Sequence, residues 1–124
     1  MNEEMVFNVS PYGGRTFRLL VCDCHNTPIL SEAISRILYT VFRESLGKRT
    51  PVEGHEEVEV EKVGAFFDEL QTSVHTNEKY NFEHRISAKM KPPFPEYNEK
   101  YVVVYLFYDT MDEPHPCEIQ VVTK

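Results

Sequence analysis

One stretch of the sequence decides how the rest is interpreted: residues 15–47 read RTFRLLVCDCHNTPILSEAISRILYTVFRESLG. Apolar side chains alternate over residues 17–21, which predicts a strand with one buried face. Residues 28–46 carry apolar side chains at the i, i+3, i+4, i+7 spacing of an amphipathic helix, and Gly47 suits the C-terminal end of that helix. The predicted apolar stripe comprises Leu30, Ala33, Ile34, Ile37, Leu38, Val41 and Phe42.

The flanking sequence adds a hairpin before this stretch and a second helix after it. Residues 5–9 alternate, and the turn signal PYGG at residues 11–14 predicts that they pair with residues 16–21. Residues 56–62 are ambiguous, because their alternating valines suit a strand while the segment equally suits the start of a helix. The helix predicted from residue 63 to about residue 77 has an apolar face of Val63, Phe66, Phe67, Leu70 and Val74.

The C-terminal half is predicted to form strands. Residues 82–90 alternate cleanly, with His84 on the apolar face. Residues 101–108 are continuously apolar, which predicts an inner strand covered on both faces. The run PPFP at residues 92–95 interrupts the chain between these strands, and residues 117–121 form a last strand.

These elements follow one another in the order β-β-α-(β)-α-β-β-β. Helices grouped between runs of strands favour an α+β fold. We therefore expect a single domain over residues 1–124. It would contain an antiparallel or mixed sheet of about five strands with two helices on one face.

The opening segment resembles a known family. The strand MVFNV at residues 5–9, the Gly13-Gly14 turn, the strand RTFRLLV at residues 15–21 and the following helix resemble the ubiquitin-like β-grasp over residues 4–46. The resemblance implies a scaffold often used for protein binding. It does not imply conjugation, because the chain ends VVTK without the Gly-Gly of a conjugated modifier.

Charge and composition argue against several classes of function. The net charge is −7, with six Lys/Arg against five Asp/Glu in residues 1–50 and seven against fifteen in residues 51–124. This balance disfavours direct nucleic-acid binding, and no apolar run reaches the length of a membrane span. The N-terminal residues lack the features of an export signal, and the cysteine count is odd. We expect a cytoplasmic protein with reduced thiols and no cofactor.

The most distinctive cluster of chemically reactive side chains is Cys22, Cys24 and His25, in the loop before the predicted helix. Together with His115 and Cys117 they supply the thiolates and imidazoles of a zinc site, although the spacing is not that of paired C-x-x-C motifs. The alternative interpretation is that the cysteines are small core residues.

A thiol nucleophile is a further interpretation of the same loop, since a helix N-terminus lowers the pKa of a nearby thiol. Phosphate chemistry of the kind found in low-molecular-weight tyrosine phosphatases is disfavoured. Those enzymes need an arginine six residues after the nucleophile, and Pro28 and Leu30 occupy that place after Cys22 and Cys24.

Two segments are candidates for contact with a partner. An acidic run suits a partner with a basic surface, although it equally suits a solvated face. A stiff proline-rich loop is predicted to expose two aromatic side chains, and such loops lose little entropy on binding. The candidate contact residues are Glu53, Glu56, Glu57, Glu59, Glu61, Phe94 and Tyr97.

The sequence therefore predicts a small acidic, non-catalytic protein that binds a macromolecule, which we expect to be another protein. Short acidic domains of this kind resemble immunity proteins and inhibitors of host defence as a class. A thiol- or zinc-dependent protein centred on Cys22, Cys24 and His25 is one alternative. A structural subunit or homodimer that uses an edge strand is another.

Overall fold

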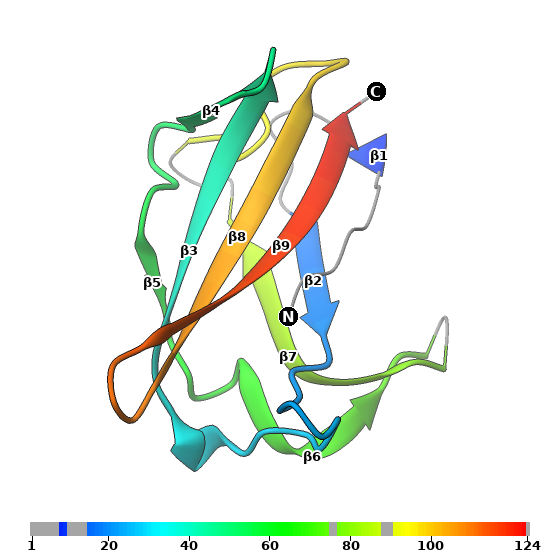
Figure 1. The fold of residues 1–124 in the computed structure, drawn as a ribbon. Coiled ribbons are helices and arrows are strands. Elements are labelled where there is room, and N and C mark those ends of the chain that lie inside the picture. The colour runs from blue at the N-terminus through cyan, green and yellow to red at the C-terminus, as the bar shows by residue number, and fades with distance from the viewer. Residues whose placement is uncertain (1–7, 10–14, 75–76, 88–90, 124) are drawn as a thin grey trace.

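Two β-sheets packed face to face make up this protein (Figure 1). The computed structural model describes residues 8–9, 15–74, 77–87 and 91–123. Within these residues there is no α-helix, and the single helical element is a 3-10 turn, η1. The elements are β1 (Asn8–Val9), β2 (Arg15–Leu19), η1 (Ser31–Ala33), β3 (Ile34–Ser45), β4 (Lys48–Pro51), β5 (Val58–Val60), β6 (Phe66–Thr72), β7 (Lys79–Ile86), β8 (Lys100–Asp109) and β9 (Pro114–Thr123).

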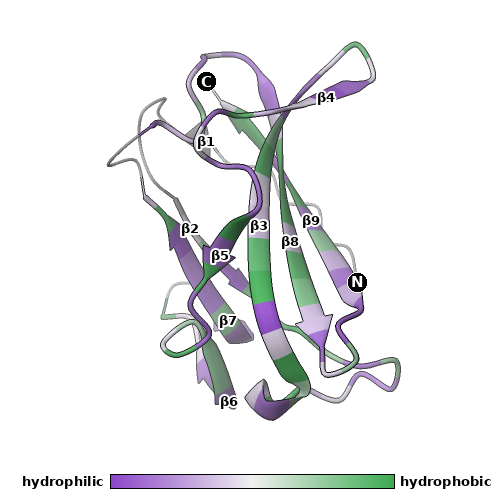
Figure 2. Ribbon diagram, turned by 90° about the vertical axis from the view of Figure 1, so that its left-hand side faces the viewer, coloured by the Kyte–Doolittle hydropathy of each residue, from purple (hydrophilic) through white to green (hydrophobic). Residues whose placement is uncertain are grey.

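The larger sheet has the order β1-β9-β8-β3-β4, and β5 also pairs with β3. The smaller sheet has the order β2-β7-β6. All neighbouring strands are antiparallel except β1, which runs parallel to β9. Figure 2 shows the two sheets as separate layers. The architecture is a β-sandwich, so the predicted α+β class with two helices is wrong.

The predicted helix over residues 28–46 is the main error. Its residues form η1 and then the twelve-residue strand β3. A strand that is apolar on both faces also satisfies the helical spacing, because neighbours such as Ile37 and Leu38 are apolar although they point to opposite sides. The many β-branched and aromatic residues of this segment favour the strand. Gly47 has a positive φ of 76° as expected, but it lies in the turn between β3 and β4, next to Leu46 at 52°.

The other local errors have similar causes. The second predicted helix is strand β6, which is apolar at its start and has an irregular register against β7. The predicted hairpin is also absent, because β1 pairs with β9 while β2 pairs with β7 in the other sheet. Residues 5–7 and 11–14 of that prediction lie outside the described residues. Without a helix packed on a sheet, the β-grasp resemblance does not hold.

The C-terminal strands were predicted in the right places. Strands β7, β8 and β9 cover most of the segments 82–90, 101–108 and 117–121, although residues 88–90 are outside the described part. The ambiguous segment 56–62 contains strand β5, as its alternating valines indicated. The proline-rich run interrupts the strands as expected, with no strand between residues 87 and 99 in the described chain.

The core lies between the two sheets and consists largely of aromatic side chains. Tyr39 on β3, Tyr105 on β8 and Phe82 on β7 meet there, with a centroid distance of 5.1 Å between Phe82 and Tyr105. Phe17 and Phe107 also pack against this cluster. Aromatic pairs in edge-to-face geometry contribute beyond the area that they bury. The cluster therefore joins the two sheets at the centre of the sandwich.

Two histidines bring polar groups into this core. His55 Nε2 lies 2.7 Å from the carbonyl oxygen of Lys91, so Nε2 carries the proton and Nδ1 accepts the hydroxyl of Tyr39 at 2.8 Å. His84 Nδ1 is 2.8 Å from the hydroxyl of Tyr105. Burial lowers the pKa of His84 from 6.5 to about 4 and raises that of Tyr105 well above its usual value. His84 is therefore neutral at physiological pH.

The strand assignment of residues 34–45 can be tested by two adjacent truncations. Ile37 is fully buried on the inner face of β3, whereas Leu38 is half-buried on the outer face. We expect Ile37→Ala to lower the free energy of unfolding by about 2–5 kcal/mol and Leu38→Ala to lower it by clearly less. Urea unfolding measures both. Equal large losses would match the apolar stripe of a helix and contradict the strand.

The low pKa of His84 predicts a dependence of stability on pH. As the pH falls from about 6.5 to 4, the unfolded chain takes up a proton at this position and the folded chain does not. The free energy of unfolding should therefore fall through this window, by up to about 3 kcal/mol. His84→Gln should therefore flatten the pH profile. Equal slopes in wild type and His84→Gln would contradict the assignment.

Candidate functional site

The two faces of the β3–β8 pair carry two different hollows. One lies at the end of the sandwich, beside the loop that contains Cys22 and Cys24. The other lies on the outer face of the larger sheet, beside Glu56 and Glu57. Because side chains alternate along a strand, the two hollows are on opposite sides of the sheet.

Asn81 of β7 holds the cysteine loop in place. Its side chain is 1% exposed, and its Oδ1 accepts the N–H of Val21 at 2.7 Å. Its Nδ2 donates to the carbonyl oxygen of Val21 at 2.9 Å and to that of Ile29 at 3.3 Å. One amide thus binds both sides of the loop at its base, where β2 has ended. This buried anchor determines where residues 22–28 lie.

Two turns of the same design border the end of the sandwich. Asp23 Oδ1 accepts the N–H groups two and four residues ahead at 2.8 and 3.0 Å, and Asp109 Oδ1 does the same at 2.8 and 3.0 Å. In both turns the fourth residue, Asn26 or Asp112, has a positive φ. The N–H donors of the turn lower the pKa of Asp23, and the bond to His115 is the largest cause of the lowered pKa of Asp109.

A cavity of about 970 Å³ lies between these turns. Four of the five residues predicted as metal ligands line it, namely Cys22, Cys24, His115 and Cys117, whereas His25 is not among the lining residues. The cavity therefore brings together residues of the loop after β2 and residues of strand β9. Among the described residues, however, no three His, Cys, Asp or Glu side chains are arranged to hold a metal ion.

The surroundings of Cys22 do not activate its thiol. Burial, followed by the nearby charge of Asp23, raises the pKa of Cys22, which is opposite to the shift that a nucleophile needs. Cys117 is buried, and Cys24 is exposed. The helix that was predicted to activate Cys24 is replaced by loop, η1 and strand.

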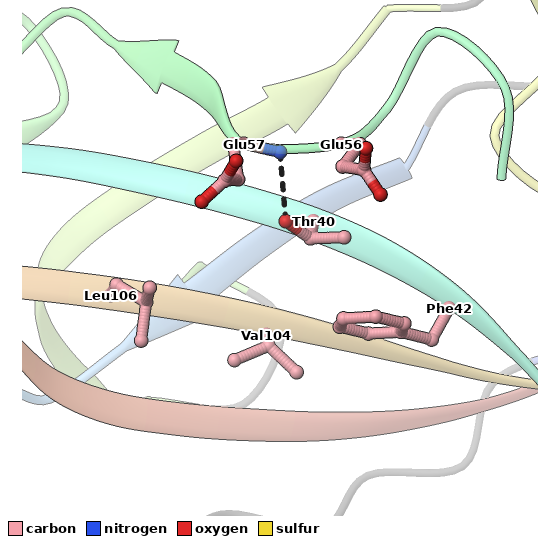
Figure 3. Close-up of a pocket in the computed structure, with 6 residues that line it drawn as sticks. All are labelled: Thr40, Phe42, Glu56, Glu57, Val104 and Leu106. Carbon is pink, nitrogen blue, oxygen red and sulfur yellow. Dashed lines mark hydrogen bonds between the residues drawn. The ribbon is translucent and has the colours of Figure 1, made fainter. Parts of the chain in front are cut away.

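The second hollow has a volume of about 360 Å³ and lies on the outer face of β3 and β8 (Figure 3). Phe42, Val104 and Leu106 are only half-buried there, although residues 101–108 were predicted to be covered on both faces. Figure 3 shows Glu56 and Glu57 on a segment that passes beside these side chains. Sequence reasoning missed the three apolar residues, because their shared face follows from strand pairing.

The loop between β4 and β5 holds the two glutamates beside the apolar side chains. His55 is 4% exposed, and its two ring nitrogens bind Tyr39 and the backbone of Lys91 inside the sandwich. The N–H of Glu57 donates to Thr40 Oγ1 at 2.8 Å, and Glu57 has a positive φ of 49°. The backbone of both glutamates is therefore fixed while their side chains remain exposed.

The other predicted contact residues differ in their exposure. Glu53, Glu59 and Glu61 are exposed, and Glu53 lies 3.7 Å from Lys91 Nζ. Tyr97 is 62% exposed.

Phe94 was expected at the surface, but it has no exposed area and packs against Tyr101 at a centroid distance of 5.4 Å. The stiff loop therefore presents one aromatic side chain and buries the other.

Comparisons with protein-family models, curated proteins and solved structures found no match for this chain. Within the described residues, no helix has the length and apolar character needed to cross a membrane.

Removal of the Asn81 side chain tests the anchoring of the cysteine loop. Asn81→Ala would leave the buried N–H and carbonyl groups at Val21 without these partners, so we expect a loss of about 1–3 kcal/mol. Amide hydrogen exchange at residues 21–29 should also accelerate. Gln71→Ala is the control, because the amide of this half-buried side chain donates to the nearby Glu69 carbonyl oxygen. Unchanged stability and exchange in Asn81→Ala would show that the loop is held by other contacts.

Proposed function

We propose that this chain is a small acidic, non-catalytic binding protein that recognises another protein through the outer face of its larger sheet. The observation that supports this most is the apolar hollow over Phe42, Val104 and Leu106 with Glu56 and Glu57 beside it. The partner would present an apolar side chain flanked by lysine or arginine.

The physical argument starts from the apolar side chains. Half-exposed Phe and Leu side chains on a paired strand are held rigidly, so little entropy is lost when a partner covers them. Burial of apolar surface contributes about 25 cal/mol per Å².

The adjacent carboxylates attract basic partners and disfavour acidic ones, which adds specificity and speeds association. An inhibitor or immunity-type protein that covers a basic surface fits this chemistry.

A cytoplasmic setting is part of the proposal. The three cysteines are free thiols, which suits a reducing environment. The homodimer alternative would need an open strand edge. Strand β4 has Lys48, Arg49 and Pro51 on its edge, and such residues oppose pairing with another strand.

Charge reversal beside the hollow tests the proposal on the partner recovered from the native cell. Glu56→Lys with Glu57→Lys should slow association, and the wild-type association rate should fall as salt rises, because exposed charges act over about 8–10 Å at physiological ionic strength. Glu69→Lys with Glu113→Lys makes the same change in net charge at exposed positions elsewhere and should have little effect. Surface plasmon resonance gives both rates.

A second variant tests the apolar part of the same surface. Leu106→Ala should speed dissociation of the complex by tenfold or more, given about 1.5–3 kcal/mol for a fully buried leucine side chain. Wild-type kinetics in both Glu56→Lys/Glu57→Lys and Leu106→Ala would contradict the proposed surface.

A further inference from the structure

We propose that the cavity between the Asp23 and Asp109 turns binds a small organic cation, namely an apolar ring or chain that carries a protonated amine or guanidinium group. This site is separate from the protein-binding surface proposed above. Phe107 and Cys117 point into the cavity from the inner side of the sheet, whereas Val104 and Leu106 line the outer hollow. The two proposals can therefore fail independently.

The floor of the cavity provides the apolar part of the recognition. Val21, Ile34, Phe107 and Cys117 are all buried, and they come from three strands of the larger sheet and from the loop after β2. A volume of about 970 Å³ is at the upper end of the range for small-molecule sites. Ligand pockets in proteins combine such an apolar lining with a few polar groups that orient the ligand.

The rim of the cavity provides the charge. Asp23, Glu32 and Asp109 line it, and no lysine or arginine does so among the described residues. The nearby cations are already engaged: Lys62 Nζ donates to two backbone carbonyl oxygens, and Arg36 pairs with Asp112 at 3.2 Å. Three carboxylates around an apolar depression favour a ligand with a positive charge at one end.

His115 adds an acceptor to this rim. Its Nε2 donates to Asp109 Oδ2 at 2.9 Å, since a carboxylate accepts but does not donate. In the neutral ring that has this tautomer, Nδ1 is an acceptor. Asp109 itself is fixed by two backbone N–H donors, so the pair is pre-organised. An ammonium or guanidinium group has the donors that such acceptors require.

A matched pair of probes tests the proposal on the full chain. The cation 1-naphthylmethylammonium and the anion 1-naphthoate share a ring system and differ in charge. Isothermal titration calorimetry at neutral pH should show that the cation binds at least about tenfold more tightly. Glu32→Gln should reduce this difference, and Glu53→Gln, which changes an exposed carboxylate outside the cavity, should not.

Blocking the cavity locates the binding. Ala33 is an exposed lining residue, so Ala33→Trp should abolish binding of the cation without loss of the fold, and Leu30→Trp provides a second blocking variant. The proposal is overturned if neither probe binds at millimolar concentration or if both bind equally. Unchanged binding of the cation to a folded blocking variant would likewise overturn it, because the probe would then bind elsewhere.

Discussion

The pairing of β3 with β8 is the constraint on which the rest of the structure depends. Its register runs from Ile34 opposite Asp109 to Glu44 opposite Lys100, with one irregularity near the start of β3. Alternation along both strands sends Tyr39 and Tyr105 into the core and leaves their neighbours on the outer face. A slip by one residue would exchange these two faces, so the aromatic core and the outer hollow are fixed by the same register.

The sequence predicted strands well where apolar and polar side chains alternate or where a run is continuously apolar. It failed in residues 34–45, where apolar positions on both faces are interrupted by polar residues. In residues 34–45 the apolar positions satisfy the helical and the strand period together, and β-branched content is only a weak guide. The deciding interaction is with β8, which lies more than fifty residues later in the chain. Local periodicity contains no information about that partner.

The candidate sites were likewise predictable from the sequence only in part. The sequence analysis grouped Cys22, Cys24, His115 and Cys117 as possible zinc ligands. The structure places these four side chains around one cavity. The exposure of the acidic run was also predicted, whereas Phe94 is buried because it packs against Tyr101 on β8. The outer hollow could not be predicted, since it depends on strand register. The positions of Glu56 and Glu57 beside the hollow depend on His55, which anchors their loop through contacts with Tyr39 and Lys91.

Two edges of the larger sheet are poorly suited to pairing with a strand of another molecule. Before Val122, β9 has no described partner on the side away from β8, and its first half contains Pro114 and Pro116. Proline is tolerated in a strand where its missing N–H would face away from the ladder, so both residues remove donors from the free edge. Together with the basic residues of β4, they oppose strand addition at these two edges of the larger sheet. A contact with another molecule at these two edges would therefore depend on side chains, because main-chain pairing is opposed there.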